Sequence, residues 1–544
     1  MTGESYAGMV RAVAARRPEV DALVFPDVRV TYRELIERAQ WRARELRALG
    51  LGAGDTFGVL LPNSPELIEL MLGGAMIGAV TVPINTRYKV YELEHICSDG
   101  RLSALFLTDA DEHVDFADLV HRTLPGLAES DPWSPAVHGF PHLRGVVLLG
   151  GRSAPGMITG AELRRRAAAQ PVPGPQDAPA GEDPLIVMYT SGTTANAKGC
   201  VTTNLALVRN AKAIAERFEI PEDDRWWDPL PMFHMGAILL MSAVFSRGGT
   251  FISQPRFEPD IAFDLIERHQ ATVLYPLFPT ITLTLMHHPR FATGVPDTVR
   301  IVSNVSPPDV QRQIQSAFAP ATLISAYGIT ELCGSLAYSR LDDSVEQRTE
   351  TCGHLLPGWD GRIVDPDTGL PVPANVRGEL VAKGPSMFAG YFGDPEQTAL
   401  SIDADGWFHT GDLCSMDADG LLSFHGRLKD QLKVGGENVS ALEVESFLAT
   451  HPAIKLAAVV GIPDDRLIEV PAAFVELVPG ESITEEEVVR FCTGRIARFK
   501  IPRYVRVVTE WPMSSTKVQK FRLRDQLLAE LPARPVASTA ATSR

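Results

Sequence analysis

Hydrophobic and polar residues alternate with two different periods along the first part of the chain. Residues 32–49 place apolar side chains at helical spacing among Glu, Arg and Ala, which predicts an amphipathic helix. Residues 57–61 form a short apolar run that predicts a buried strand, and residues 65–76 return to the spacing of a helix. Helices that alternate with buried strands are typical of α/β layering.

A proline-rich connector separates this part from the next. Residues 171–184 contain five prolines, which predicts an exposed segment between layers or subdomains. The apolar run 185–188 then predicts a strand, and it leads into the stretch YTSGTTANAKG at residues 189–199. This stretch carries the first candidate chemistry of the chain.

The stretch 189–199 combines several groups that bind phosphate. Gly192 allows the backbone to turn with its N–H groups facing inward, and Lys198 adds a positive charge. Short hydroxyl side chains surround them, at Thr190, Ser191, Thr193 and Thr194. Together they predict a concave receptor for a polyphosphate. The loop is not a Walker A loop, because no Gly-Lys-Ser/Thr opens a helix at the required spacing, and a plain turn is the alternative.

In its order of residues this stretch resembles the phosphate-binding signature of the adenylate-forming superfamily, which includes acyl-CoA synthetases, peptide-synthetase adenylation domains and luciferases. The family usually has Gly where Ala195 stands and Pro where Ala197 stands. Five or more motifs follow the family's order along nearly the whole chain, and this shared order is more specific than any one motif. The likeness is greatest to acyl-CoA ligases of the carnitine-CoA ligase type.

The string LISAYGITEL predicts a strand that ends in a nucleotide-binding turn. Tyr327 offers a stacking face for adenine, Gly328 permits close approach, and Glu331 can bind a Mg²⁺ that neutralises phosphate oxygens. The resemblance adds Thr330 to the expected ATP contacts and places Thr190 beside Glu331 as a metal ligand.

A ribose site is expected further along the chain, after Gly390-Tyr391-Phe392 has followed in the family's order. Asp412 stands where a turn opens onto a strand, and its carboxylate could accept hydrogen bonds from both ribose hydroxyls. An Asp that only caps a turn is the alternative. Ribose binding is favoured because Arg427 follows at the family's spacing and offers a second ribose or phosphate contact.

Two segments are candidates for the acid-binding pocket. His234 ends the segment DPLPMFH; a lone histidine is more often structural than catalytic, but by resemblance this segment lines the acyl and pantetheine passage. The predicted strand at residues 299–306 ends where the family has a Gly-Gly-Ala-Pro-like turn and this chain has Asn304, Val305 and Ser306. The bulkier side chains are expected to reshape the acid site.

From about residue 427 the pattern changes to that of a small α+β domain. Capped helices are predicted at residues 440–450 and 484–495, and strands at 455–461 and 472–478. By resemblance the chain divides into an N-terminal adenylation domain (1–426), a hinge (427–430) and a mobile C-terminal domain (431–531), followed by a small polar tail (532–544) that is expected to be disordered.

The C-terminal domain carries two turns with expected catalytic roles. Lys517 is the best match to the family's catalytic lysine, although Thr516 stands at the glycine of the usual Thr-Gly-Lys. Lys520 is the fallback, and a basic surface loop is the alternative. Rotation about Lys429 would bring a second turn to the active site for thioester formation, with Lys433, Gly435 and Gly436.

Composition limits the remaining possibilities. The net charge of −16 disfavours nucleic acid and anionic membranes as partners. Six scattered cysteines without a Cys-x-x-Cys pair suggest neither a disulfide framework nor a zinc site and fit a reducing cytoplasm. The start of the chain lacks a hydrophobic signal core, and no apolar run is long enough to predict a membrane span.

The resemblance therefore implies an AMP-forming acid–thiol ligase of α/β class, with a large N-terminal domain of layered mixed sheets and helices and a small mobile α+β domain. ATP with Mg²⁺ would activate a small carboxylic acid as an acyl-adenylate, and coenzyme A would accept the acyl group. The expected catalytic residues are Lys517, Glu331 and Thr190. Alternatives are transfer to an amine or a separate carrier protein, or a degenerate homologue that only binds nucleotide. The sequence identifies neither the acid nor the oligomeric state.

Overall fold

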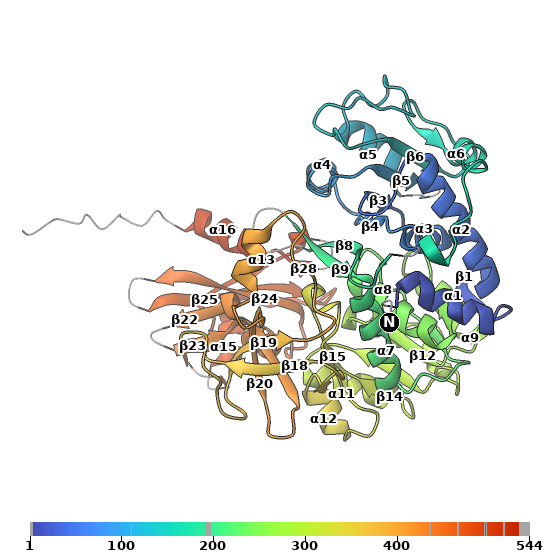
Figure 1. The fold of residues 1–544 in the computed structure, drawn as a ribbon. Coiled ribbons are helices and arrows are strands. Elements are labelled where there is room, and N and C mark those ends of the chain that lie inside the picture. The colour runs from blue at the N-terminus through green and yellow to red at the C-terminus, as the bar shows by residue number, and fades with distance from the viewer. Residues whose placement is uncertain are drawn as a thin grey trace, which may run out of the picture.

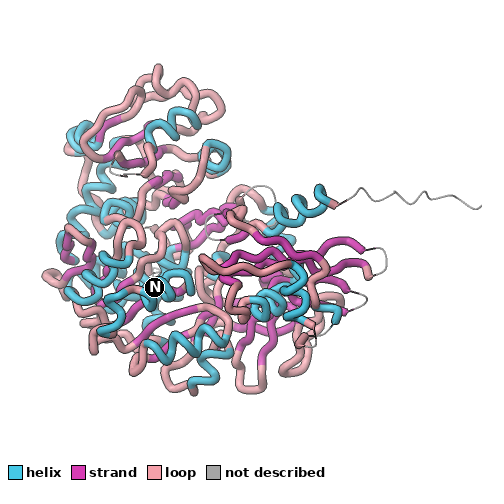
Figure 2. Tube along the Cα trace, turned by 180° about the vertical axis from the view of Figure 1, so that it is seen from behind, coloured by secondary structure: helices cyan, strands magenta, loops and turns pink. Residues whose placement is uncertain are grey.

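The computed structural model describes residues 4–531 except 110, 112, 178, 191–196, 435–436, 465–466, 494, 497 and 515–516. The N-terminal part is built on two seven-stranded sheets, and the C-terminal part is a smaller body rich in strands (Figure 1). Seen from behind, helices cover the sheets of the N-terminal part, whereas strands dominate the C-terminal part (Figure 2). The predicted fold class is confirmed.

The first large sheet has the order β7-β6-β5-β3-β4-β8-β9, and it is parallel except for the final β8–β9 pair. One of its faces is covered by α2, α3 and α6 and the other by α4 and α5. The elements are α2 (Tyr32–Ala48), β3 (Thr56–Leu60), α3 (Pro65–Ala75), β4 (Val80–Pro83), α4 (Val90–Asp99), β5 (Ala104–Thr108), α5 (Phe116–Thr123), β6 (Gly145–Leu149), β7 (Ile158–Thr159), α6 (Gly160–Ala167), β8 (Pro184–Thr190) and β9 (Lys198–Thr203).

The second large sheet has the order β14-β13-β12-β10-β11-β1-β2. Helices α1, α7 and α8 pack on one face, in a core that they share with α2 and α3, so these helices lie between the two sheets. Helices α9, α10 and α11 cover the other face. The elements are α1 (Tyr6–Arg16), β1 (Asp21–Phe25), β2 (Val28–Thr31), α7 (Asn204–Arg217), β10 (Arg225–Trp227), α8 (Met235–Arg247), β11 (Thr250–Ile252), α9 (Pro259–Arg268), β12 (Val273–Leu277), α10 (Pro279–His287), β13 (Ile301–Asn304), α11 (Pro308–Ala317) and β14 (Thr322–Ile324).

Two antiparallel sheets complete the part that precedes the predicted hinge. They are β15-β16-β17 and β18-β19-β20-β21. Their elements are β15 (Ala326–Tyr327), β16 (Ala337–Tyr338), α12 (Val345–Glu350), β17 (His354–Leu355), β18 (Asp360–Val364), β19 (Gly378–Lys383), α13 (Pro395–Ser401), β20 (Phe408–Met416) and β21 (Leu422–Arg427).

The remaining residues build the C-terminal sheet β23-β22-β25-β24, with β26 beside β25. Helices α14 and α15 cover one face and α16 the other. The elements are β22 (Gln431–Val434), β23 (Glu437–Ser440), α14 (Ala441–Leu448), β24 (Ile454–Asp464), β25 (Ile468–Leu477), α15 (Glu485–Cys492), β26 (Tyr504–Val507), the hairpin β27 (Met513–Ser514) and β28 (Lys517–Val518), and α16 (Lys520–Glu530); short 3₁₀ turns are η1 (Pro175–Asp177), η2 (Pro289–Thr293), η3 (Thr330–Leu332), η4 (Leu428–Asp430) and η5 (Arg498–Lys500).

Local sequence signals explain where several elements begin. The predicted helix at residues 32–49 is α2, and it begins at a capping box in which Thr31 and Glu34 satisfy each other's backbone N–H. Thr484 and Glu487 form the same arrangement at α15. The segment 323–332 differs from the prediction of one strand: β14 belongs to the large sheet, β15 to the small one, and the N–H of Ser325 between them donates to Ser339 Oγ.

The hinge and domain boundaries stay predictions, but the backbone changes sheet at the expected place. The 3₁₀ turn η4, which contains Lys429, separates β21 of one sheet from β22 of another. Ser440 at the start of α14 donates to the carbonyl O of His425 over 2.6 Å, which joins the two parts in this structure. Among the described residues, no helix is both long and apolar enough to cross a membrane.

Candidate active site

The predicted phosphate loop joins two antiparallel strands. Strand β8 ends at Thr190 and β9 begins at Lys198, and these two residues face each other in the strand register. The backbone therefore brings a hydroxyl and an ammonium to the same end of the hairpin. The candidates Ser191, Gly192, Thr193 and Thr194 lie outside the described residues, as does Ala195.

Glu331 lies beside this hairpin end, and a tyrosine links it to the hairpin. The Tyr391 hydroxyl donates to Glu331 Oε1 over 3.0 Å, while the Lys198 ammonium lies 5.4 Å from the centre of the Tyr391 ring. Burial, and then the Glu331 carboxylate, raise the pKa of the Tyr391 hydroxyl, so it remains a donor. We call Lys198, Glu331 and Tyr391, with Thr190, the phosphate-side cluster.

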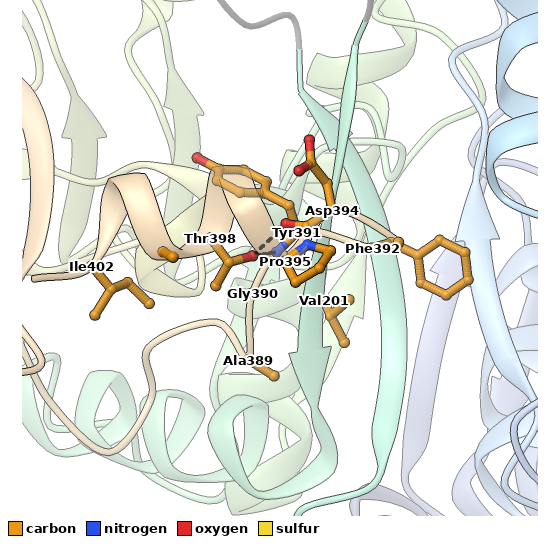
Figure 3. Close-up of a pocket in the computed structure, with 11 residues that line it drawn as sticks. Val201, Ala389, Gly390, Tyr391, Phe392, Asp394, Pro395, Thr398 and Ile402 are labelled. Carbon is orange, nitrogen blue, oxygen red and sulfur yellow. Dashed lines mark hydrogen bonds between the residues drawn. The ribbon is translucent and has the colours of Figure 1, made fainter. Parts of the chain in front are cut away.

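The segment that carries Tyr391 is held against β9 by backbone hydrogen bonds. The N–H of Val201 donates to Gly390, and the N–H of Phe392 donates to Gly199. Figure 3 shows how this segment lines a pocket of 570 Å³ together with Thr398, whose Oγ1 accepts from the N–H of Tyr391. Tyr391 was not among the expected site residues: its motif is visible in the sequence, but its contact with Glu331, 60 residues away, is not.

The three residues expected at the nucleoside come together. The Tyr327 hydroxyl donates to Asp412 Oδ2 over 2.5 Å, and Arg427 Nε lies 2.8 Å from Asp412 Oδ1. Asp412 and Arg427 are paired residues on β20 and β21. Asp412 is only 1% exposed, and burial together with its carboxylate raises the pKa of the Tyr327 hydroxyl. We call Tyr327, Asp412 and Arg427 the nucleoside-side cluster.

Gly328 is required by the fold itself, whatever its role toward a nucleotide. A Cβ at this position would lie 2.0 Å from the carbonyl O of Gly334, so a side chain would collide with the turn that returns the chain to β16. The close approach shown here is therefore to the protein's own backbone. Thr330 and Glu331 follow in η3, so one short segment links the two clusters.

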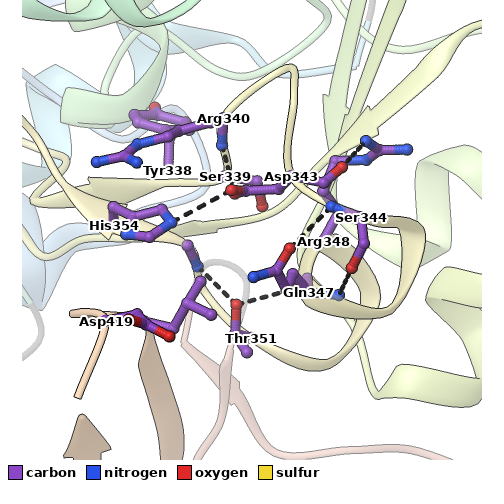
Figure 4. A network of polar contacts seen from close by, with 12 residues as sticks. Tyr338, Ser339, Arg340, Asp343, Ser344, Gln347, Arg348, Thr351, His354 and Asp419 are labelled. Carbon is purple, nitrogen blue, oxygen red and sulfur yellow. Dashed lines mark hydrogen bonds and ion pairs between the residues drawn. The ribbon is translucent and has the colours of Figure 1, made fainter. Parts of the chain in front are cut away.

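The sheet that carries Tyr327 is braced by a network of polar contacts (Figure 4). Asp343 Oδ2 accepts from the N–H of Arg340 over 2.7 Å, and Asp343 Oδ1 lies 3.2 Å from His354 Nε2. Arg348 on α12 donates to the carbonyl O of Asp343. Because β17 contains His354 and pairs with β16, these contacts hold the strand next to β15 in place.

The acid-pocket candidates differ in burial. His234 precedes α8 and packs edge-on against Phe233, with 4.9 Å between ring centroids. Asn304 is fully buried and donates to Thr282 Oγ1 on α10, which covers the opposite face from α8. Val305 is 38% exposed, and Ser306 follows it.

The two candidate lysines near the end of the chain differ. Lys517 lies on β28 opposite Ser514, and its side chain lies outside the described residues. Lys520 Nζ is 2.7 Å from Glu445 and 3.9 Å from Asp430, so two carboxylates already neutralise it. The side chains of Lys429 and Lys433, and residues Gly435 and Gly436, also lie outside the described part.

The fold is that of an α/β enzyme, and the residues predicted to bind a nucleotide gather in two clusters. The sequence profile of the family described as AMP-binding enzyme matches residues 10–392, and that of the AMP-binding enzyme C-terminal domain matches residues 443–517. The chain belongs to the AMP-binding enzyme family.

Individual relatives agree with this membership. The chain is 33% identical to the putative acyl-CoA synthetase YngI of Bacillus subtilis, over 96% of each chain, and 31% identical to the human mitochondrial medium-chain acyl-CoA ligase ACSF2, over 97% of this chain and 88% of that one. Among solved structures, the anthranilate CoA ligase AuaEII in complex with anthranoyl-AMP superimposes with a TM-score of 0.84 at 26% identity, over 98% of this chain and 99% of that chain. The predicted enzyme class, an adenylate-forming acyl-CoA synthetase that uses ATP and coenzyme A, is confirmed.

Proposed function

We propose that the two clusters hold ATP for attack by a small carboxylic acid, and that Thr190, Glu331 and Lys517 are the catalytic residues. The observation that carries this proposal is the spacing of Tyr327 and Glu331. They stand four residues apart on one segment, and each belongs to a different cluster. One stretch of backbone would thus fix both the nucleoside and the phosphates of the same molecule.

The chemistry follows from the low reactivity of a carboxylate. It is anionic and resonance-stabilised, so a thiol does not displace its oxygen. Attack of the carboxylate on the α-phosphate of ATP gives an acyl-adenylate and releases pyrophosphate, and attack of the coenzyme A thiol on that mixed anhydride then releases AMP. In the first step the protein must align two anions and neutralise their charge, which suits Lys198 and Lys517.

The residues near Glu331 fit a Mg²⁺ that arrives with ATP. Among the described residues there is no group of three or more His, Cys, Asp or Glu side chains that could hold a metal ion alone. Mg²⁺ is commonly bound by one or two carboxylates together with substrate phosphates. We therefore assign Glu331, with the Thr190 hydroxyl, to hold the ion, which would supply charge neutralisation at the phosphates.

The C-terminal part would serve the two half-reactions in turn. Lys517 would neutralise charge during adenylation, and the turn with Lys433, Gly435 and Gly436 would replace it when the thiol attacks. Lys429 in η4 is the proposed pivot. Lys520 is a poor substitute for Lys517, because its ammonium is paired with Glu445 and Asp430.

The carboxylic acid substrate and the final acceptor of the acyl group can be identified by direct measurement. The names of the relatives include medium-chain acyl and anthranilate ligases, so they favour no single acid. A panel of straight-chain, branched and aromatic acids should be screened by pyrophosphate exchange, and the best acid then offered coenzyme A, hydroxylamine or a carrier-protein thiol. We expect exchange with at least one acid and acid-dependent AMP release that is fastest with coenzyme A. Nucleotide binding without pyrophosphate exchange would overturn the catalytic assignment. If the acyl group were transferred faster to hydroxylamine or to the carrier-protein thiol than to coenzyme A, that compound would be assigned as the acceptor instead.

A further inference from the structure

Helix α4 packs against the hairpin that carries the proposed phosphate loop, and two of its side chains reach the two ends of that loop. His95 Nε2 lies 2.8 Å from the carbonyl O of Ala197. The Tyr189 hydroxyl donates to Asp99 Oδ2 over 2.5 Å. Residues four apart on a helix share one face, so a single face of α4 contacts the chain before and after residues 191–196.

In the hydrogen bond between His95 and Ala197, the donor and the acceptor can be assigned. A backbone carbonyl only accepts hydrogen bonds, so His95 donates through Nε2–H, which both the cation and one neutral tautomer can do. The imidazole also meets the Tyr189 ring edge-on, with 6.1 Å between ring centroids. His95 therefore touches both ends of the loop, one through a hydrogen bond and the other through its ring.

Asp99 occupies a position that local helix rules disfavour. It is the last residue of α4, where a carboxylate meets the negative end of the helix dipole. Residues that break a local rule are expected at functional or strained sites. Gly100 follows, and a Cβ there would lie 2.7 Å from the carbonyl O of Ile96 and 3.2 Å from the Tyr189 hydroxyl oxygen, so a side chain would crowd both the end of α4 and this contact. The Tyr189 hydroxyl, which is buried, gives this exposed carboxylate a hydrogen-bond donor.

We propose that His95 and Asp99 are positioning residues for the phosphate loop. By holding Tyr189 and Ala197, the neighbours of Thr190 and Lys198, α4 braces this end of the β8–β9 hairpin and so preorganises the Thr190 hydroxyl and the Lys198 ammonium for the phosphates of ATP. The inference rests on the proposed function of residues 190–198. It adds that a helix outside the two clusters controls ATP binding, although neither side chain is assigned a contact with the nucleotide.

The test is the affinity for ATP with Mg²⁺, measured by calorimetry without any acid. Loss of one hydrogen bond in His95→Ala, Asp99→Ala or Tyr189→Phe should raise the dissociation constant by about threefold to tenfold. Asp99→Asn keeps an acceptor oxygen and should restore most of the affinity. Glu94→Ala removes an exposed acid from the same helix and should bind ATP like the parent.

Two further readouts separate positioning from a general structural role. Amide hydrogen exchange over residues 189–199 should be faster in the three weakened variants, with the thermal midpoint little changed. Thioester formation from a supplied acyl-adenylate should stay within about twofold of the parent, because the phosphates that the loop holds have left. Tyr189→Phe keeps the buried ring, so it decides the matter if the alanine variants do not fold.

The possible failures are distinguishable. A parent protein that does not bind ATP would overturn the proposed function and this inference with it. A parent that binds ATP, with variants that bind equally well and exchange at the same rate, would overturn the inference alone. Equal loss of ATP binding and of thioester formation, together with a lower thermal midpoint, would show a structural role and overturn it as well.

Discussion

The nucleoside-side and phosphate-side clusters are joined by one short segment, yet they are built differently. Asp412 is nearly inaccessible and lies on paired antiparallel strands, with Tyr327 and Arg427 already in contact with its carboxylate. Glu331, Lys198 and Tyr391 are partly exposed, and Glu331 lies in a 3₁₀ turn. The first cluster is thus centred on a buried, paired carboxylate, whereas the second is more open to solvent.

This difference matches what each end of ATP would undergo in the proposed reaction. Adenosine keeps its structure through both half-reactions, so a rigid site can hold it from start to finish. The phosphates lose pyrophosphate after the first step, and the charge near them must then be withdrawn. The comparison predicts that changes on the phosphate side affect the two half-reactions unequally, while changes on the nucleoside side affect nucleotide binding throughout.

The largest effect is expected at Lys517. Its charge is proposed to stabilise the α-phosphate only during adenylation, so Lys517→Ala should slow acyl-adenylate formation by about 10²–10⁴-fold, as for other preorganised charge contacts. Thioester formation from supplied acyl-adenylate should persist. Rapid-quench measurement of each half-reaction checks this, with Lys520→Ala as the comparison. If Lys520→Ala lost adenylation instead, the role would belong to Lys520 despite its pairing with Glu445.

The next effect is expected at Asp412. Asp412→Ala should weaken ATP binding by about 1.5–3 kcal/mol, the range for hydrogen bonds to a charged acceptor. It should also lower the thermal midpoint, because the buried Tyr327 hydroxyl loses its acceptor. Asp412→Asn keeps the shape and removes the charge, which separates packing from ribose recognition. Unchanged ATP affinity in calorimetry would contradict the assignment of the nucleoside-side cluster.

A smaller effect is expected at the proposed pivot. Lys429→Ala should change little, whereas Lys429→Pro fixes φ and restricts Leu428, which should trap one arrangement of the C-terminal part. Adenylation should persist and thioester formation should drop by at least about tenfold, a barrier change of about 1.4 kcal/mol. A proline variant that forms thioester at the parent rate would rule out rotation at this residue.

Local signals were sufficient for some parts of the fold and not for others. The apolar spacing of residues 32–49 is a local signal, so α2 could be predicted to within a residue. The sheet change at Ser325 depends on Ser339, which no local pattern near Ser325 shows. Likewise Asp412 and Arg427 could be proposed from motif order, but the contact of Tyr391 with Glu331 required the folded chain. The order of the motifs thus suggests which residues to consider for a site, and the structure adds which of them contact one another.

The smallest effect tests how Glu331 is supported. Tyr391→Phe keeps the ring beside Lys198 and removes only the donor to Glu331 Oε1. Loss of about 1 kcal/mol should raise the Mg²⁺ concentration for half-maximal adenylation about fivefold. Glu331→Gln should raise it further, because a neutral amide is a poorer ligand for a hard cation. If the hydroxyl acts only through the carboxylate, adding Tyr391→Phe to Glu331→Gln should change little more, whereas fully additive effects would show that Tyr391 acts independently. The affinity for adenosine, which reports on the nucleoside side alone, should match the parent in all three variants.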